Sequence, residues 1–489
     1  MELDIFWLIL AILVGTCVVA LGFIKKITEW HYVRKFGEKR HSLPPGDMGW
    51  PFIGNNRSYH QALNADDPDR YMNDLVKRHG RTGIYKAHLL GSPSIIVTTP
   101  ENFRRVLNDD DTFGVGYPVA MNILAGKRTF LNVQNVAHRR LRNLLLTPTT
   151  SHEALAIYLK NIEDLVISSL EDWSSRDKPV ELLNELRRFA YRNVFRMALG
   201  ADSDPIIDKM ENLIADFHFG FQCSVVDIPG SGFHKARQAK KKLLNILQTE
   251  IDNRRAMKES GRQKPKGGML DLMMEPQDES GRRLDDEEII EVLLVLSFAG
   301  VSTPAHVSTW STIFLHRHPE VLQKAKKEQE EIIKRRPSSQ KGLSFAEIRQ
   351  MEYLPRVIDE ALRFFNIPFS DLRIAQKDTN INGYFIPKGW KVMLWTRAVH
   401  LDPEIYPAPL EYNPSRWDNR VVKPGSFVPF GGGARKCIGS DMAKIEILTY
   451  LHYFLLNYKL EQLNPVCPIV HLPQPRPADN CLARIVKLK

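Results

Sequence analysis

The sequence has 489 residues, and its 67 Lys and Arg against 57 Asp and Glu give a formal net charge of +10. With 43% hydrophobic and 25% charged residues the composition is globular, which excludes a disordered or fibrous chain. Five scattered cysteines do not form a disulfide framework, so we expect a reducing compartment. No internal repeat and no flexible linker divides the sequence beyond residue 60, which favours one large folded unit.

An uncharged apolar run from Ile5 to Ile24 comes first in the chain. A helix of this length rises about 30 Å, enough to span the hydrocarbon core of a bilayer. Acidic residues precede the run and basic residues follow it, which is the reverse of a cleaved signal peptide and places the body in the cytoplasm. We predict a transmembrane signal anchor over residues 1–25, a basic, proline-rich hinge over 26–46 that contacts membrane lipid, and a catalytic body over 47–489.

Apolar residues at helical spacing dominate the body. They predict helices over 67–79, 100–109, 138–146, 152–174, 182–200, 206–220, 234–259, 285–316, 318–335, 344–365 and 440–455. Shorter runs predict two hairpins, one that joins 82–85 to 94–97 and one that joins 381–385 to 391–395. The predicted fold is mainly α with a small β lobe.

The segment from Phe430 to Gly439 carries the strongest chemical signal. Three consecutive glycines precede Cys437, and glycine lets a backbone approach a flat group closely. Backbone N–H groups, the Arg435 cation and the N-terminal end of the next predicted helix would all stabilise a thiolate. A lone cysteine is more often a small buried apolar residue, but this setting favours a thiolate that ligates iron.

Phe430, Gly433, Arg435, Cys437 and Gly439 match every specified position of F-x-x-G-x-R-x-C-x-G, the haem-binding signature of the cytochrome P-450 monooxygenases. The chain therefore resembles that family. The resemblance implies the P-450 fold, haem b with its iron held by Cys437, O2 as a substrate, electrons from NADPH through a separate reductase, and a single-pass location in the endoplasmic reticulum membrane. We expect no nucleic-acid partner, because the positive charge is spread along the chain.

Two further motifs support the resemblance. Glu360 and Arg363 match the family's E-x-x-R, and Arg416 lies in a segment like the one whose arginine joins that pair. Residues three apart share a helix face, so the first two can form an ion pair. Such a pair is usually a solvated surface pair of little value, whereas the resemblance implies a structural clamp behind the haem.

The resemblance also proposes cations for the haem propionates. They are Arg435, Arg373 and Arg142. His138 stands where the family usually has a tryptophan. Its ring N–H could donate to a propionate, or it could be an ordinary interfacial histidine.

Residues 299–304, Ala-Gly-Val-Ser-Thr-Pro, align with the family's A-G-x-[D/E]-T-[T/S]. Thr303 is kept and could relay protons, whereas Ser302 replaces the acid and could pass a proton only through water. Pro304 lacks an N–H and leaves the Gly300 carbonyl without its helical partner, so we predict a kink. A pseudo-enzyme that has lost oxygen activation is the alternative.

The segments 43–51, 80–86 and 413–418 look most like the plant kaurenoic acid oxidase and β-amyrin oxidase subgroup, which oxidises rigid polycyclic terpenoids. The apolar stretch 364–369 suits a wall for such a skeleton, although a Phe-rich stretch is more commonly core. The predicted pocket residues are Ala299, Ile367, Pro368 and Phe369.

Departures from the gibberellin-pathway pattern, at Asp371 and over 299–304, favour a triterpenoid, of cucurbitane type, over kaurenoic acid. The predicted function is a membrane-anchored haem-thiolate monooxygenase that hydroxylates or further oxidises a polycyclic terpenoid. An oxygen-independent isomerase or dehydratase on the same fold is a rival that Ser302 favours and Thr303 disfavours. A haem-binding scaffold without catalysis is a second rival, which a requirement for NADPH during turnover would exclude.

Overall fold

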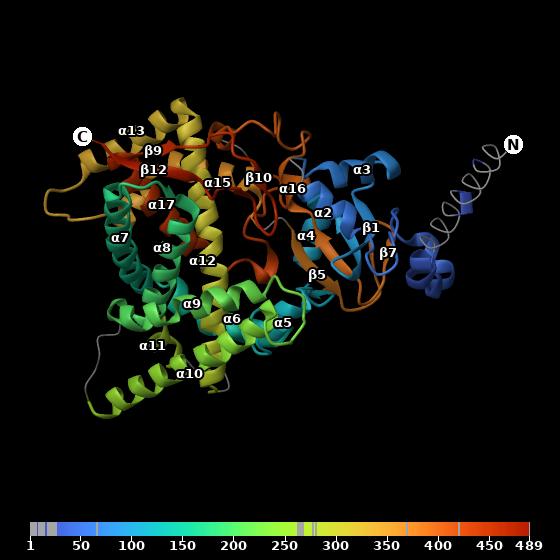
Figure 1. The fold of residues 1–489 in the computed structure, drawn as a ribbon, viewed down its shortest axis with the longest axis horizontal. Helices are drawn as coiled ribbons and strands as arrows, with labels where there is room; N and C mark the ends of the chain where they lie inside the picture. The colour runs from blue at the N-terminus through green and yellow to red at the C-terminus, as the bar shows by residue number, and fades with distance from the viewer. Residues whose placement is uncertain are drawn as a thin grey trace. The chain divides into compact units, whose positions relative to one another are not determined.

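The structure is a computed structural model that describes residues 7, 15–16, 27–64, 67–261, 268–275, 278, 281–367, 370–418 and 421–488. The chain divides into two compact units, which we call the β unit and the helical unit (Figure 1). The β unit takes its residues from Met1–Gly116, Ser370–Val399 and Pro424–Ser426, and the helical unit from Tyr117–Phe369, His400–Lys423 and Phe427–Lys489. The chain passes between the units five times, so no single linker marks the boundary.

The β unit is built on one mixed sheet with the strand order β1-β2-β8-β5-β3. Strand β2 pairs antiparallel with β1 and parallel with β8, with Ile95 opposite Val392. The elements are η1 (Arg34–Ser42), α2 (Asn56–Asn64), α3 (Arg70–His79), β1 (Ile84–Leu89), β2 (Ser92–Val97), α4 (Pro100–Leu107), β3 (Phe113–Val115), β5 (Asp371–Ala375), β6 (Thr379–Ile381), β7 (Tyr384–Ile386), β8 (Lys391–Leu394) and α16 (Thr396–His400), whose last residue belongs to the other unit.

The two predicted hairpins have different outcomes. The first is confirmed as β1 and β2. The second is wrong in its pairing, because β7 turns back on β6 around Asn382-Gly383, where both residues have positive φ. Strand β8 joins β2 and β5 in the main sheet instead. The Asn-Gly turn is the two-residue loop of a hairpin formed by β6 and β7, so β8 pairs with other strands.

The helical unit holds the long helices and a three-stranded sheet of order β4-β12-β9. Its elements are α5 (Val119–Ala125), α6 (Asn135–Thr150), α7 (His152–Ser175), β4 (Val180–Glu181), α8 (Leu182–Leu199), η2 (Ala201–Ser203), α9 (Asp204–Gly220), α10 (Gly232–Glu259), α11 (Met269–Met273), α12 (Asp286–Arg317), α13 (Pro319–Arg335), α14 (Phe345–Gln350), α15 (Tyr353–Phe365), η3 (Pro414–Trp417), η4 (Gly433–Arg435), α17 (Ser440–Asn457), β9 (Tyr458–Gln462), β10 (Ile469–Val470), β11 (Arg476–Pro477) and β12 (Leu482–Lys487).

The long helix α12 forms the core of this unit and packs against α8, α15 and α17 (Figure 1). A capping box starts it, in which Asp285 accepts from the Glu288 N–H and Glu288 accepts from the Asp285 N–H. Pro319 follows its C-cap and begins α13. The helix runs without a break through Pro304. Its neighbours therefore supply the packing that offsets a missing helical hydrogen bond.

Among the described residues, one helix has the length and composition to cross a membrane, and that helix is α12. Within its apolar stretch 61% of the residues are buried inside the protein, as expected of a core helix. The predicted anchor over 1–25 lies almost entirely outside the described residues.

Candidate active site

The cysteine loop runs between the start of the motif and α17. The backbone N–H of Cys437 donates to the Phe430 carbonyl at 2.9 Å and closes the loop. Gly431 and Gly433 have φ of 69° and 63°, a conformation that strains other residues. The glycines are thus needed to bring the cysteine back over the start of the loop. Helix α17 begins at Ser440, three residues after the cysteine.

The Cys437 thiol is open to solvent, yet burial is the largest influence on its pKa and raises it. An exposed sulfur surrounded by protein atoms indicates an internal cradle rather than the outer surface. The Gly439 backbone N–H donates to this sulfur, and both it and the Arg142 cation lower the thiol pKa. These groups favour the thiolate that a metal ligand needs.

Helix α6 lies against the cysteine loop. Arg142 donates to the Lys436 carbonyl at 2.7 Å, and Arg435 donates to the Val133 carbonyl at 3.2 Å. His138 is 3% exposed on the same helix. The structure therefore places three of the four proposed propionate partners on the cysteine loop or on the helix that contacts it.

The middle of α12 has an open face. Ala299 is exposed and Thr303 is half-buried, although most residues of this helix are buried. The Thr303 hydroxyl donates to the Ala299 carbonyl at 2.7 Å. Ser302 instead donates to the Gln474 side-chain oxygen at 2.7 Å. Residues next to the open face and to Cys437, namely Phe298 and Ile438, pack against the same apolar cluster.

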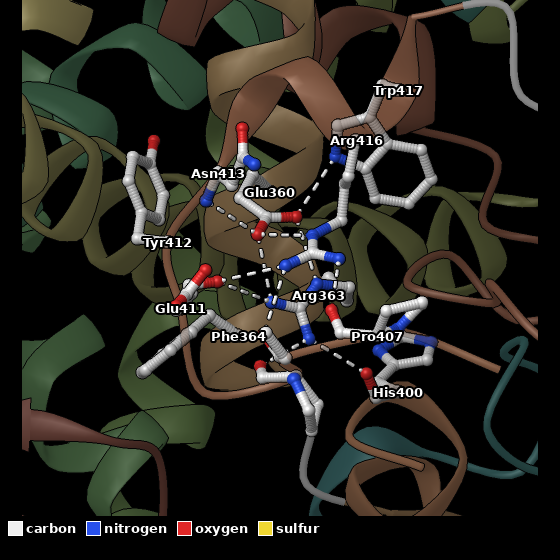
Figure 2. A network of polar contacts seen from close by, with 12 residues as sticks. Glu360, Arg363, Phe364, His400, Pro407, Glu411, Tyr412, Asn413, Arg416 and Trp417 are labelled. Carbon is white, nitrogen blue, oxygen red and sulfur yellow. Dashed lines mark hydrogen bonds and ion pairs between the residues drawn. The ribbon is translucent and has the colours of Figure 1, made fainter. Parts of the chain in front are cut away.

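The predicted clamp forms in the core of the helical unit (Figure 2). Arg363 donates from Nε and Nη2 to both Glu360 oxygens at 2.9 Å, and both side chains are 0% exposed. Arg416 adds a bond to Glu360 Oε1 at 2.8 Å, and the Asn413 N–H and the Trp417 indole complete the carboxylate's partners. The arginines give their other N–H groups to the carbonyls of His400, Pro407, Ala408, Pro409 and Glu411.

His400 connects this clamp to the cysteine loop, and the sequence alone did not single it out. Its carbonyl accepts from Arg363, while its Nε2 accepts from the Val428 backbone N–H at 3.0 Å. Burial lowers the pKa of His400 to about 3, so the ring is neutral and can accept. Gly431 in turn donates to the Val428 carbonyl. A lone histidine between two motifs carries no signal of this kind in the sequence.

The remaining predicted residues are placed as follows. Arg373 lies in the β unit on β5, 2% exposed and paired with Asp371 at 3.1 Å. Ile367 is 5% exposed and belongs to the apolar core of the helical unit. Pro368 and Phe369 lie outside the described residues.

The residues around Cys437 fit a haem group. Among the described residues, no group of three or more His, Cys, Asp or Glu could hold a metal ion. A single thiolate suits a metal that brings its other ligands with it, as porphyrin-bound iron does. A Cβ at Gly439 would meet no atom within 4 Å, so the loop leaves open space beside the sulfur.

Comparison with known proteins decides the family. The cytochrome P450 family model matches residues 44–479. The chain belongs to the cytochrome P450 family. It is a cytochrome P450 monooxygenase, it binds haem b whose iron takes a cysteine thiolate, and it uses O2 and electrons from a redox partner. The predicted fold class is also confirmed: the retinoic acid-bound cyanobacterial CYP120A1 aligns with a TM-score of 0.81 at 24% identity, over 91% of this chain and 99% of that one.

Curated P450 relatives match over nearly the whole chain. The 7,8-epoxymelianol synthase of Ailanthus altissima is 49% identical over 100% of this chain and 98% of its own length. The beta-amyrin 11-oxidase of Glycyrrhiza uralensis is 47% identical over 95% of each chain. The ent-kaurenoic acid oxidase 1 of Arabidopsis thaliana is 46% identical over 94% of each chain. The resemblance to this plant subgroup is confirmed.

Proposed function

We propose that this P450 oxidises a triterpenoid, and that Cys437 is the residue whose thiolate would hold the haem iron. The open Cys437 thiol in its glycine loop is the observation that carries the site assignment. Bound haem supplies the activation of O2 and the insertion of one oxygen atom into a C–H bond. The chain's own part is to hold the thiolate, to exclude water and to place the substrate.

In this proposal the propionates are held by His138, Arg142 and Arg435. Arg435 lies in the cysteine loop, Arg142 on α6 contacts it, and His138 lies one helical turn before Arg142. Backbone carbonyls accept from Arg142 and Arg435 and so hold the two guanidinium groups in place. Arg373 is proposed for the same role from the family resemblance. The clamp consists of Glu360, Arg363 and Arg416. It holds His400 in place, and the His400 ring in turn accepts a hydrogen bond from Val428 at the start of the cysteine loop.

Thr303 is the proposed proton relay. Its hydroxyl is half-buried on the open face of α12 and is held by the Ala299 carbonyl. A hydroxyl fixed in this way would accept a hydrogen bond from water and could relay a proton into the substrate pocket. Ala299, exposed one turn before it, is the pocket residue that the structure supports.

The substrate class rests on the relatives. Melianol and β-amyrin are both triterpenoids, and they appear in the names of relatives that are 49% and 47% identical to this chain. A cucurbitane-type triterpenoid is the first candidate. The alternative substrate is ent-kaurenoic acid, favoured by the 46% identity to its oxidase.

We further infer a location on the endoplasmic reticulum membrane. The apolar run over residues 1–25 would anchor the chain, the basic hinge over 26–46 would contact lipid headgroups, and the body over 47–489 would face the cytoplasm, where an NADPH-dependent reductase could reach it.

Turnover with the full chain and a plant NADPH-cytochrome reductase in microsomes tests the substrate assignment. Triterpenoids of cucurbitane, oleanane and melianol type are supplied in parallel with ent-kaurenoic acid. We expect a product with added oxygen from a triterpenoid and none from ent-kaurenoic acid. Product from ent-kaurenoic acid alone would establish the alternative.

A further inference from the structure

The connection between β10 and β11, residues 471–475, lies along α12. The two strands that flank it pair Ile469 with Pro477 and Val470 with Arg476. Pro473 and Pro475 lie within the connection and have no backbone N–H to donate. The connection therefore has fewer backbone donors of its own to hold it in place.

Two side chains of α12 supply those bonds. The Ser302 hydroxyl donates to the Gln474 side-chain oxygen at 2.7 Å, and the Trp310 indole N–H donates to the Pro475 carbonyl at 2.8 Å. Eight residues of helix separate the two donors by about 12 Å. The connection is thus fixed at two points along the helix, and Ser302 provides the one nearer to Thr303.

Ser302 also lies at the edge of the open face. At about 100° per residue, its side chain points about 60° away from that of Ala299 and about 100° away from that of Thr303. Ala299 is exposed, whereas Gln474 is half-buried. Gln474 therefore borders the face on which the substrate is expected to lie.

The neighbours of Ser302 do not supply protons. Its single hydroxyl hydrogen is directed at an amide oxygen, which does not ionise near neutral pH. Its other contact is His306 Nδ1 at 3.4 Å, but that N–H donates to the Ser302 carbonyl at 2.6 Å. Burial lowers the pKa of His306 to about 3, so the ring stays neutral. A serine in this setting is suited to holding a loop and poorly suited to moving a proton.

We propose that Ser302 is a positioning residue, which fixes the 471–475 connection through Gln474 and so shapes the substrate pocket. At the position where the family pattern has an acid, this chain therefore has a residue with a structural role. We call the hydrogen bond from Ser302 to Gln474 the latch. Proton supply rests on Thr303 and water. This proposal refines the proposed function at the same site, but the latch itself exists whichever terpenoid is the substrate.

Hydrogen exchange followed by mass spectrometry on the full-length holoprotein tests the latch directly. In Ser302→Ala and in Gln474→Ala, exchange of peptides that cover 471–478 should rise about tenfold, the effect of one lost hydrogen bond. The double variant should exchange no faster than either single variant, because both changes remove the same bond. Ser302→Thr, which keeps the hydroxyl, should restore the slow exchange. Ser308→Ala on the same helix is the control and should leave these peptides unchanged.

A second readout separates the latch from proton supply. With the substrate identified by turnover, Ser302→Ala should keep the product formed per NADPH consumed while the mixture of products broadens. Unchanged exchange over 471–478 in Ser302→Ala would overturn the latch, and so would a loss of coupling as large as that of Thr303→Ala. Exchange is measured without turnover, so a failure of the triterpenoid assignment leaves this test intact.

Discussion

At the scale of single residues, Cys437 differs from the other described cysteines in its surroundings. Cys481 is fully buried and burial raises its pKa to about 12, while Cys223 and Cys467 are half-buried. Cys437→Ala should abolish the thiolate-type carbon monoxide difference spectrum of the reduced protein. Cys223→Ala is the matched control and should retain it. A thiolate spectrum in Cys437→Ala would assign the ligand to another cysteine.

The clamp predicts a large effect on stability. Arg363→Ala leaves the Glu360 carboxylate buried without its bidentate partner, which should cost about 3–5 kcal/mol of unfolding free energy. Arg188, whose side chain is 56% exposed beside Glu211, offers a control that should change stability by less than about 1 kcal/mol. Thermal unfolding of the two variants measures the difference. Equal effects would show that the buried network does not support the fold.

Glu446 predicts a pH dependence. It is 4% exposed on α17, and burial raises its pKa to about 8, with the Asn193 amide donating to it at 2.7 Å. The unfolded chain ionises this carboxyl near pH 4.5, whereas the folded chain keeps it protonated up to about 8. The folded state binds more protons between these two pH values. The stabilisation that Glu446 contributes is therefore full below about pH 4.5 and is lost as the pH rises through about 8.

Glu446→Gln should therefore gain stability relative to the parent between pH 4.5 and 8, by up to about 1.4 kcal/mol per pH unit. Melting temperatures of the holoprotein across this range measure the gain. Glu330→Gln, on the exposed face of α13, is the control and should show a constant difference. A constant difference for Glu446→Gln as well would mean that this carboxyl is ionised in the folded protein.

The chemical motifs could be predicted at this scale, and their supports could not. Glycine spacing around Cys437 and the i, i+3 pair of Glu360 and Arg363 are local patterns that a sequence displays. His400 and Asn193 act through contacts 28 and 253 residues away along the chain. Their roles depend on packing that no local pattern encodes. Ile367, which the sequence predicts as a pocket residue, lies in the same apolar core as Phe365 of α15.

At the scale of elements, the open face of α12 predicts a loss of coupling. Thr303→Ala should lower the product formed per NADPH consumed and release peroxide, because the relay hydroxyl is gone while the thiolate loop is intact. Thr309 makes the same hydroxyl-to-carbonyl bond, to Ala305 at 2.8 Å, but is 1% exposed in the core. Thr309→Ala is thus a matched control and should keep its coupling. Full coupling in Thr303→Ala would assign proton delivery to ordered water or to the substrate's own hydroxyl.

Helices were predictable where a single apolar stripe and local caps define them, as in α12 and α17. The predicted helix over 344–365 is in fact two helices, α14 and α15. The Glu328 carboxylate of α13 accepts from the N–H groups of Glu352, Tyr353 and Leu354, and so caps the start of α15 from a distance. The pairing predicted for β8 is wrong for a similar reason, since this strand pairs with β2 and β5.

At the scale of the whole molecule, the sequence suggested a single unit, and the contacts divide it into two. The β unit consists of three stretches that are separated by more than 20 residues, so no single linker in the sequence marks its boundary. The family was predictable because its haem signature is short and specific. Substrate choice was not, because it depends on the placement of one C–H bond by a whole pocket.

Turnover in an atmosphere of heavy-isotope O2 tests the central claim most directly. Microsomes that contain this chain and a reductase receive NADPH and the triterpenoid that gives product, and mass spectrometry reads the isotope in that product. A monooxygenase predicts that the hydroxyl group added to the substrate carries one labelled oxygen atom, and that no product forms without NADPH. Product formed without NADPH, or without the label, would contradict this account and favour an oxygen-independent isomerase or dehydratase on the same fold.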